Sequence, residues 1–364
     1  MSTILFGCCN KGTDLGTPAP AKAATQQIVF MEQVKPSLGP RGFELVTMNL
    51  DGSDRRQLTD NEEQEFLPHF SPDGTRLVFT EFTTGGYGFV NSRSDVAVYA
   101  FGSGTQTRLT HTDVDGQPVW SPDGARIAFV RQAPAGAVRV GGLWVMNADG
   151  SDPHEIVAPA GPPSELTFGD PAWSSDDWIF FIVAQQVGTD GCFKARVDKV
   201  RPDGTARAKV SDGGPNCTPA GKEQSGDADP GVSADGKTIY SSRGFPTAPA
   251  EGPSGFTERR LFSFSSDAWY SGKPERDLSL AAEPSCIEGV PKGSPDGTRV
   301  LLFRVCFDGG AAAQPGIYLA DTLGSYRTLV STAPLGGAGV PGVFGPDWNP
   351  LWTPSGRATG GDRQ

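Results

Sequence analysis

The stretch that decides the fold is Pro118-Val119-Trp120-Ser121-Pro122-Asp123-Gly124, which an apolar run follows. Similar phrases recur about every 50 to 60 residues along the chain. The other copies, from strong to fragmentary, lie at residues 68–74, 171–177, 230–236, 291–297 and 346–350. A period of this length indicates a chain built from repeated supersecondary units.

Each residue of the Ser-Pro-Asp-Gly element suits a tight turn. Proline presets φ at the first corner, aspartate caps the turn through its side chain, and glycine accepts a positive φ. The strand at residues 118–121 should therefore pair antiparallel with the strand at 126–130. Two further strands follow, joined by Asp-Gly turns at 51–52, 149–150 and 203–204. Four antiparallel strands per repeat predict the blade of a β-propeller.

The number of repeats follows from how the chain begins and ends. Complete four-strand repeats begin near residues 66, 117, 170, 229 and 288. The chain opens with three strands that lack a first strand, and it closes with a lone first strand at Asp347-Trp348. We therefore predict an all-β, six-bladed propeller over residues 28–352. Its C-terminal strand would pair with the N-terminal blade and remove the exposed edges. Residues 353–364 are expected to be a disordered tail.

The repeats resemble those of the TolB-type (WD40-like) β-propeller family. Trp120 to Gly124, Ile127-Ala128-Phe129 and Met146 to Ser151 match the family's turn and strand motifs closely. The phrases at 174–177 and 233–236 depart from the pattern by losing the proline. The resemblance implies a stand-alone propeller without TolB's N-terminal domain. It also implies a non-catalytic, periplasmic binding role, since the TolB propeller binds a partner lipoprotein, although similar repeats also precede serine peptidase domains.

The net charge and the N-terminal sequence limit which partners and which cellular location we expect. The net charge of −11 repels phosphate backbones, so we expect no nucleic-acid partner. Leu5-Phe6-Gly7-Cys8 resembles a bacterial lipoprotein cleavage box in which Cys8 is lipidated, although the preceding apolar stretch is short. Residues 12–27 have the composition of a flexible tether, so residues 1–27 form a lipoprotein-like leader. The alternative is that the match is accidental.

One face of the predicted disc should carry the binding surface. The loops between second and third strands, and the crossings between blades, are long and irregular, whereas the turns of the other face are short. Long loops on a rigid scaffold commonly carry binding sites. Aromatic side chains on this loop-rich face would supply contact area, although they could equally tuck onto the blades. They are Tyr87, Phe89, Phe193, Phe245, Phe256 and Phe307.

A second candidate feature is acidic. Three residues before the repeat's proline stand Glu65, Asp115, Asp227 and Glu288, and Phe168 and Val343 interrupt the series. Because first strands are innermost, we expect these four carboxylates near the mouth of the central channel, where they could hold a basic group or a cation such as calcium. The alternative is structural: each acid would bond a neighbouring arginine or backbone group. No other cofactor is expected.

The cysteines other than Cys8 and Cys9 predict disulfides on the same face. Cys286 precedes a first strand and Cys306 follows the adjacent second strand, so antiparallel pairing should bring them close. Cys192 and Cys217 lie in the loop and crossing of one blade. An even set of cysteines in a candidate secreted protein favours Cys192–Cys217 and Cys286–Cys306 bridges. The alternative is four free thiols.

Enzymatic signatures are weak. The three histidines lie in different parts of the predicted propeller, so we expect no histidine-rich metal site. There is no Gly-x-Ser-x-Gly elbow. We therefore predict a monomeric, non-catalytic module of the bacterial envelope that binds a protein or peptide and is periplasmic, outer-membrane-anchored or secreted. The alternative is a carbohydrate-active enzyme or glycan binder, which would require two open mouth carboxylates about 5 to 9.5 Å apart.

Overall fold

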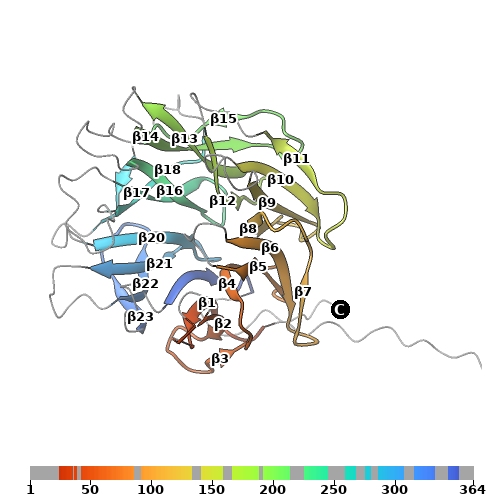
Figure 1. Cartoon of the computed structure of the whole chain (residues 1–364). Helices are drawn as coiled ribbons and strands as arrows, with labels where there is room; N and C mark the ends of the chain where they lie inside the picture. The colour runs from red at the N-terminus through yellow and green to blue at the C-terminus, as the bar shows by residue number, and fades with distance from the viewer. Residues whose placement is uncertain are drawn as a thin grey trace, which may run out of the picture.

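The computed structural model describes residues 24–35, 37–38, 42–85, 92–132, 141–158, 166–187, 192–213, 225–244, 259–267, 275–279, 286–306, 315–332 and 343–351. Within these ranges the long regular elements are all β-strands (Figure 1). No helix in the described part of the chain is long and apolar enough to cross a membrane. The all-β prediction is confirmed.

The strands form sets of four with antiparallel neighbours. The set that joins the two ends of the chain runs β24-β1-β2-β3. Its strands are β1 (Ile28–Gln33), β2 (Phe43–Met48), β3 (Arg56–Gln57) and β24 (Val343–Trp348). The next set contains β4 (Gln64–Phe70), β5 (Arg76–Thr84), β6 (Arg93–Ala100) and β7 (Thr105–Arg108). A third contains β8 (Asp115–Trp120), β9 (Arg126–Gln132), β10 (Gly141–Asn147) and β11 (His154–Val157).

The remaining strands repeat this pattern. One set contains β12 (Leu166–Trp173), β13 (Ile179–Val187), β14 (Cys192–Val200) and β15 (Ala208–Lys209). The next contains β16 (Ser225–Val232), β17 (Thr238–Gly244), β18 (Arg259–Ser265) and β19 (Arg276–Asp277). The last contains β20 (Cys286–Gly293), β21 (Arg299–Cys306), β22 (Gly316–Asp321) and β23 (Thr328–Thr332). Short parallel bridges, β14 to β16 and β18 to β20, link these three sets.

The repeat phrase forms the predicted hairpin turn. Ser121 donates through its hydroxyl to Asp123 at 2.6 Å and accepts from the Arg126 amide at 2.9 Å. Gly124 has φ of 69°, a conformation that glycine adopts without strain. The turn thus places strand β9 antiparallel to β8, with Trp120 opposite Ile127.

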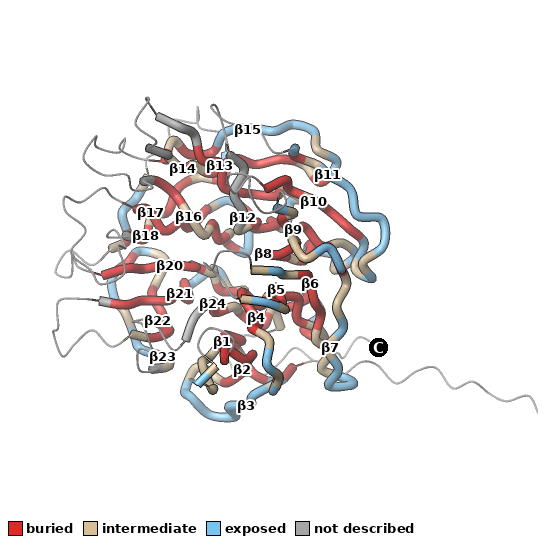
Figure 2. Tube along the Cα trace, viewed as in Figure 1, coloured by how far each residue is buried: buried red, intermediate tan, exposed pale blue. Residues whose placement is uncertain are grey.

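Apolar side chains fill the space between neighbouring sets. Trp120 of β8 lies in one cluster with Val78 and Val96 of the preceding set. Arg76 covers the Trp120 ring at 4.4 Å, and Arg126 covers Trp173 of the following set at 5.1 Å. Burial is deepest in the inner and middle strands, whereas outer strands such as β3 and β7 carry exposed residues (Figure 2). These contacts form the joints between sets.

The chain ends meet where the prediction places them. Strand β24 pairs antiparallel with β1, and Asn349 donates through its side-chain amide to the carbonyl of Gln26 at 2.8 Å. Trp348 also donates to the carbonyl of Lys292 in β20 at 2.9 Å. A closed ring requires these contacts between the last and first sets. The six-bladed closed ring as a whole stays a prediction.

The first strand of each set begins earlier than expected. Strand β8 was predicted from Pro118 but starts at Asp115, three positions before the proline. The reason is a bulge: the register of β8 with β9 shifts between Gly116 and Val119, and Gln117 has φ of 51°. The bulge lets the strand continue past the proline, which has no amide hydrogen for the ladder.

Candidate functional site

The four predicted mouth carboxylates lie within the first three residues of the first strands of their sets, and all four, Glu65, Asp115, Asp227 and Glu288, are buried. Three of them face an arginine directly across the hairpin, in the register pairs Asp115–Arg131, Asp227–Arg243 and Glu288–Arg304. The geometry of these three matches the structural alternative, in which each acid bonds a neighbouring arginine.

These pairs have the short contacts of strong ion pairs. Arg131 donates from Nε and Nη2 to the two Asp115 oxygens at 2.7 and 2.9 Å. Arg243 donates to Asp227 at 2.7 and 3.2 Å, and also to Glu275. Bidentate arginine–carboxylate contacts are strong hydrogen bonds, but breaking a buried pair is costly because one charge is left alone.

Glu65 is the exception among the four. Its register partner is Glu81, not an arginine. Glu65 accepts from the Asn61 side-chain amide at 2.6 Å and contacts the Thr59 hydroxyl at 3.2 Å. Burial raises the pKa of Glu65 to about 8, and the nearby Glu44 charge acts in the same direction. The criterion set for a glycosidase, two open and unpaired acids, is not met by these four residues.

The other predicted site residues are only partly described. Tyr87, Phe89, Phe245, Phe256, Phe307, Cys8 and Cys217 lie outside the described residues. Phe193 and Cys192 lie in β14, and Cys306 ends β21. Cys286 and Cys306 are register partners across β20 and β21, so the adjacency expected from antiparallel pairing is confirmed.

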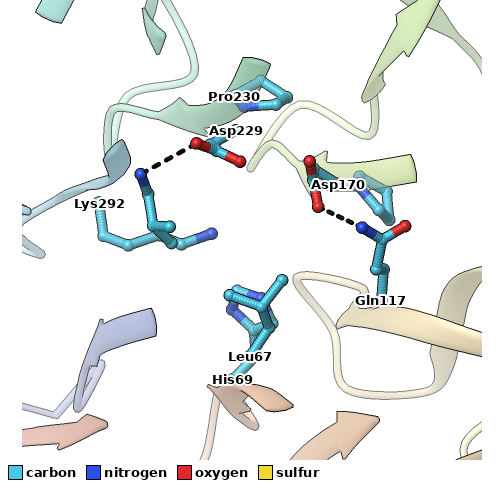
Figure 3. A pocket seen from close by; sticks show the side chains of 9 residues that line it. Leu67, His69, Gln117, Asp170, Asp229, Pro230 and Lys292 are labelled. Carbon is cyan, nitrogen blue, oxygen red and sulfur yellow. Dashed lines mark hydrogen bonds between the residues drawn. The ribbon is translucent and has the colours of Figure 1, made fainter. Parts of the chain in front are cut away.

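A polar pocket lies two residues farther along the first strands. A cavity of about 20 Å³ is lined from five sets, one after another. Its lining residues are Leu67, His69, Gln117, Asp170, Pro171, Asp229, Pro230, Val290 and Lys292. In Figure 3 the labelled side chains of Lys292, Asp229, Asp170, Gln117 and His69 surround one space. A volume of this size has room for one or two water molecules or the tip of one side chain.

The backbone around this axial pocket is unusual. The residue before the repeat's proline has a left-handed φ, between 48° and 59°, in all six first strands. These residues are Leu67, Gln117, Asp170, Asp229, Val290 and Gly345. A left-handed φ is strained for most side chains and most of all for β-branched valine. The bulge turns the side chains of the non-glycine residues toward the axis.

Charged groups face one another across the axial pocket. Gln117 donates to Asp170 at 2.6 Å, and Asp229 accepts from the Ser242 hydroxyl at 3.0 Å (Figure 3 shows the first of these). His69 lies 3.5 Å from Asp347, which also accepts from the Phe70 amide at 3.0 Å. The acids therefore come from sets on both sides of the axis.

The two basic groups of the pocket, Lys292 and His69, have shifted pKa values. Burial lowers the pKa of Lys292, while Asp347, Asp170 and Asp229 act against that shift. Burial lowers the pKa of His69 as well, and the Lys292 charge adds to the effect. The lining therefore holds two aspartates, Asp170 and Asp229, against one lysine and a histidine whose pKa is lowered.

Sequence reasoning missed the axial pocket because it read the acids three positions before the proline. The pocket is built from the residues directly before and after the proline, and these include Asp170, Asp229 and Lys292. Comparing the residues directly before and directly after the proline in all repeats would have found these three residues. Among the described residues, no group of three or more His, Cys, Asp or Glu side chains is arranged to hold a metal ion.

Four-stranded antiparallel sets arranged around a polar axis define a β-propeller. The sequence model of the TolB beta propeller domain family matches residues 22–244, more than half of the chain. The chain belongs to this family, and the resemblance seen in its repeats is confirmed.

Known proteins support the same conclusion. The Tol-Pal system protein TolB of Anaeromyxobacter dehalogenans (strain 2CP-C) is 30% identical over 116 residues, which are 32% of this chain and 24% of that protein. This chain thus matches about a quarter of the length of that relative. TolB from Acinetobacter baumannii has a similar structure, with a TM-score of 0.60 and 15% identity over 89% of this chain and 66% of that one.

Similar folds also occur in an enzyme. The structure of Kuenenia stuttgartiensis hydrazine synthase has a TM-score of 0.64 and 16% identity, covering 90% of this chain and 47% of that one. At such identity the likeness shows the fold alone.

Proposed function

We propose that this propeller is a non-catalytic binding module of the bacterial cell envelope. It would hold a protein or peptide partner on the loop-rich face, with part of the partner reaching the axial pocket. The observation that carries the proposal is membership of the TolB beta propeller domain family, whose relatives include Tol-Pal system proteins. The strained, polar pocket supports it, because strained backbone clusters at ligand sites.

The pocket also restricts how the partner binds. Its volume of about 20 Å³ admits one small group, so most of the contact would lie on the loops outside it. Its excess of aspartates favours a neutral or basic group over an acidic one.

A position-specific photocrosslink would test this proposal. A photoreactive residue would replace Gln117, which lines the pocket, or Gln106, which lies in the outer strand β7. In the native envelope we expect one defined protein adduct from position 117 and none from position 106. No adduct from position 117, or the same adducts from both positions, would contradict the proposed site.

The location and the covalent chemistry are proposals of the same kind. We propose a periplasmic protein, anchored to the outer membrane through a lipid on Cys8 or else secreted, with Cys192–Cys217 and Cys286–Cys306 bridges. The facing positions of Cys286 and Cys306 across β20 and β21 support the second bridge. Mass spectrometry of the protein from its host, before and after reduction, would test the lipid and both bridges.

A further inference from the structure

The joint between the β24-β1-β2-β3 set and the β4–β7 set breaks the charge pattern of the repeats. At the position where the other acidic hairpins have an arginine, β5 has Glu81 opposite Glu65. Gln106 and Arg108 both donate to Glu81, and Arg108 also contacts Glu63 at 3.2 Å. The nearby guanidinium therefore serves Glu81 and Glu63, and the side-chain donors to Glu65 among the described residues are the uncharged Asn61 and Thr59.

Glu44 of β2 closes the joint from the other side. Its side chain is fully buried, and Oε1 accepts from Lys35 at 3.0 Å and from the Asn61 amide at 3.2 Å. Its Oε2 is buried and has no hydrogen-bond partner among the described residues. Asn61 thus bonds Glu44 through its backbone and Glu65 through its side chain, which ties the two carboxyl groups together.

Two buried carboxylates that share no cation in the described part of the chain are unstable as a pair of charges. Taking an unpaired carboxylate out of water costs several kcal/mol, roughly, so such a group binds a proton instead. Among the described residues, several elements contribute charged groups to this joint. They are Lys35 after β1, Glu44 in β2, Asp60 and Glu63 before β4, Glu81 in β5, Asp95 in β6 and Arg108 in β7. Carboxylates outnumber cations in this group.

We propose that Glu65 carries a proton at neutral pH and that this proton holds β2, β4 and β5 together at the joint. When the proton leaves, Glu44, Glu65 and Glu81 repel one another, and the joint opens on the loop-rich face. The segment at residues 59–63 is released first, because Thr59 and Asn61 connect it to Glu65. This pH-dependent opening of the joint is separate from partner binding and does not depend on it.

The direction of the pH effect follows from proton linkage. Glu65 has an ordinary pKa of 4.5 when the chain is unfolded, and burial raises the pKa to about 8 in the folded protein. The folded state therefore binds the proton more tightly than the unfolded state. The stabilisation that this proton gives the folded state is full below pH 4.5 and is lost as the pH rises through about 8.

Hydrogen exchange in the intact protein would test the proposal. The reporter is the Leu45 amide, which donates to the Thr59 hydroxyl at 2.9 Å. After correction for the intrinsic exchange rate, its opening constant should rise about tenfold or more between about pH 6 and about pH 9. In Glu65→Gln the opening constant should not change with pH.

Two variants make the result specific. Glu44→Gln removes a charge that raises the Glu65 pKa, so the opening transition should move to lower pH, which a merely structural role would not cause. Glu155→Gln is the control, because Glu155 is exposed in β11, away from this joint, and the variant should give the same pH response at Leu45 as wild type. A flat wild-type profile, or an unmoved transition in Glu44→Gln, overturns the proposal. If Glu65→Gln does not fold, the wild-type and Glu44→Gln profiles still decide.

Discussion

The hairpins β8–β9 and β4–β5 bury an acid at the same repeat position but compensate its charge differently. In β8–β9, Asp115 faces Arg131 with contacts of 2.7 and 2.9 Å. In β4–β5, Glu65 faces Glu81, and in the described part of the chain its side-chain donors are the uncharged Asn61 and Thr59. In β8–β9 the acid is thus paired within its own hairpin, whereas in β4–β5 it is bonded by residues that precede β4. Where the arginine is missing, a proton is the simplest replacement.

The largest effect is expected where a deeply buried arginine faces a fully buried acid directly across its hairpin. Arg243 has a side chain 3% exposed and holds the fully buried Asp227 together with Glu275. Arg243→Met should lower the free energy of unfolding by about 4 kcal/mol, because Asp227 is left buried without its cation. Urea unfolding followed by tryptophan fluorescence would measure the loss. Adding Asp227→Asn should recover a large part of it; no recovery would mean that lost packing, not lost pairing, is responsible.

A smaller effect is expected where water reaches the pair. The Arg131 side chain is 23% exposed, although Asp115 is fully buried. Arg131→Met should cost about 2 kcal/mol, since water partly replaces the guanidinium and since the Trp144 ring loses its cation at 4.1 Å. The same urea experiment measures this loss. A cost equal to or above that of Arg243→Met would show that exposure does not set the size of the effect.

The smallest effect is expected where two arginines share one acid. Arg327 contacts both oxygens of Glu288, at 2.7 and 2.8 Å, and Arg304 contacts it at 3.2 Å. Arg304→Met should therefore cost only about 1 kcal/mol, because Glu288 keeps its bidentate partner. Measuring the free energy of unfolding of Arg304→Met and Arg327→Met in one series checks that Arg327 is the main partner of Glu288. A larger loss for Arg304→Met would reverse the assignment of the main partner.

Much of the fold could be predicted from the repeat because its turn chemistry is local. Ser121, Asp123 and Gly124 form the expected turn through contacts within six residues. The strand starts were placed too late, because a proline at Pro118 normally ends a ladder and the bulge at Gln117 is not visible in residue type. The position of Cys286 opposite Cys306 followed from pairing alone.

The candidate site was harder to predict because it depends on contacts between distant residues. Acids at the start of first strands were visible, but whether each finds an arginine depends on the residue across the hairpin, Arg131 in one case and Glu81 in another. The axial residues Asp170, Asp229 and Lys292 belong to three different repeats. Their convergence requires the ring of first strands, which no short sequence window contains.

The most direct test of this account is the pKa of Glu65, measured by a carbon-detected NMR titration of its side-chain carboxyl group. We predict a pKa of about 8, because burial raises the pKa of Glu65 and the Glu44 charge acts in the same direction. A value near the ordinary 4.5 would mean that the carboxylate is ionised and compensated at neutral pH. That result would contradict both the contrast between the two hairpins and the protonated joint.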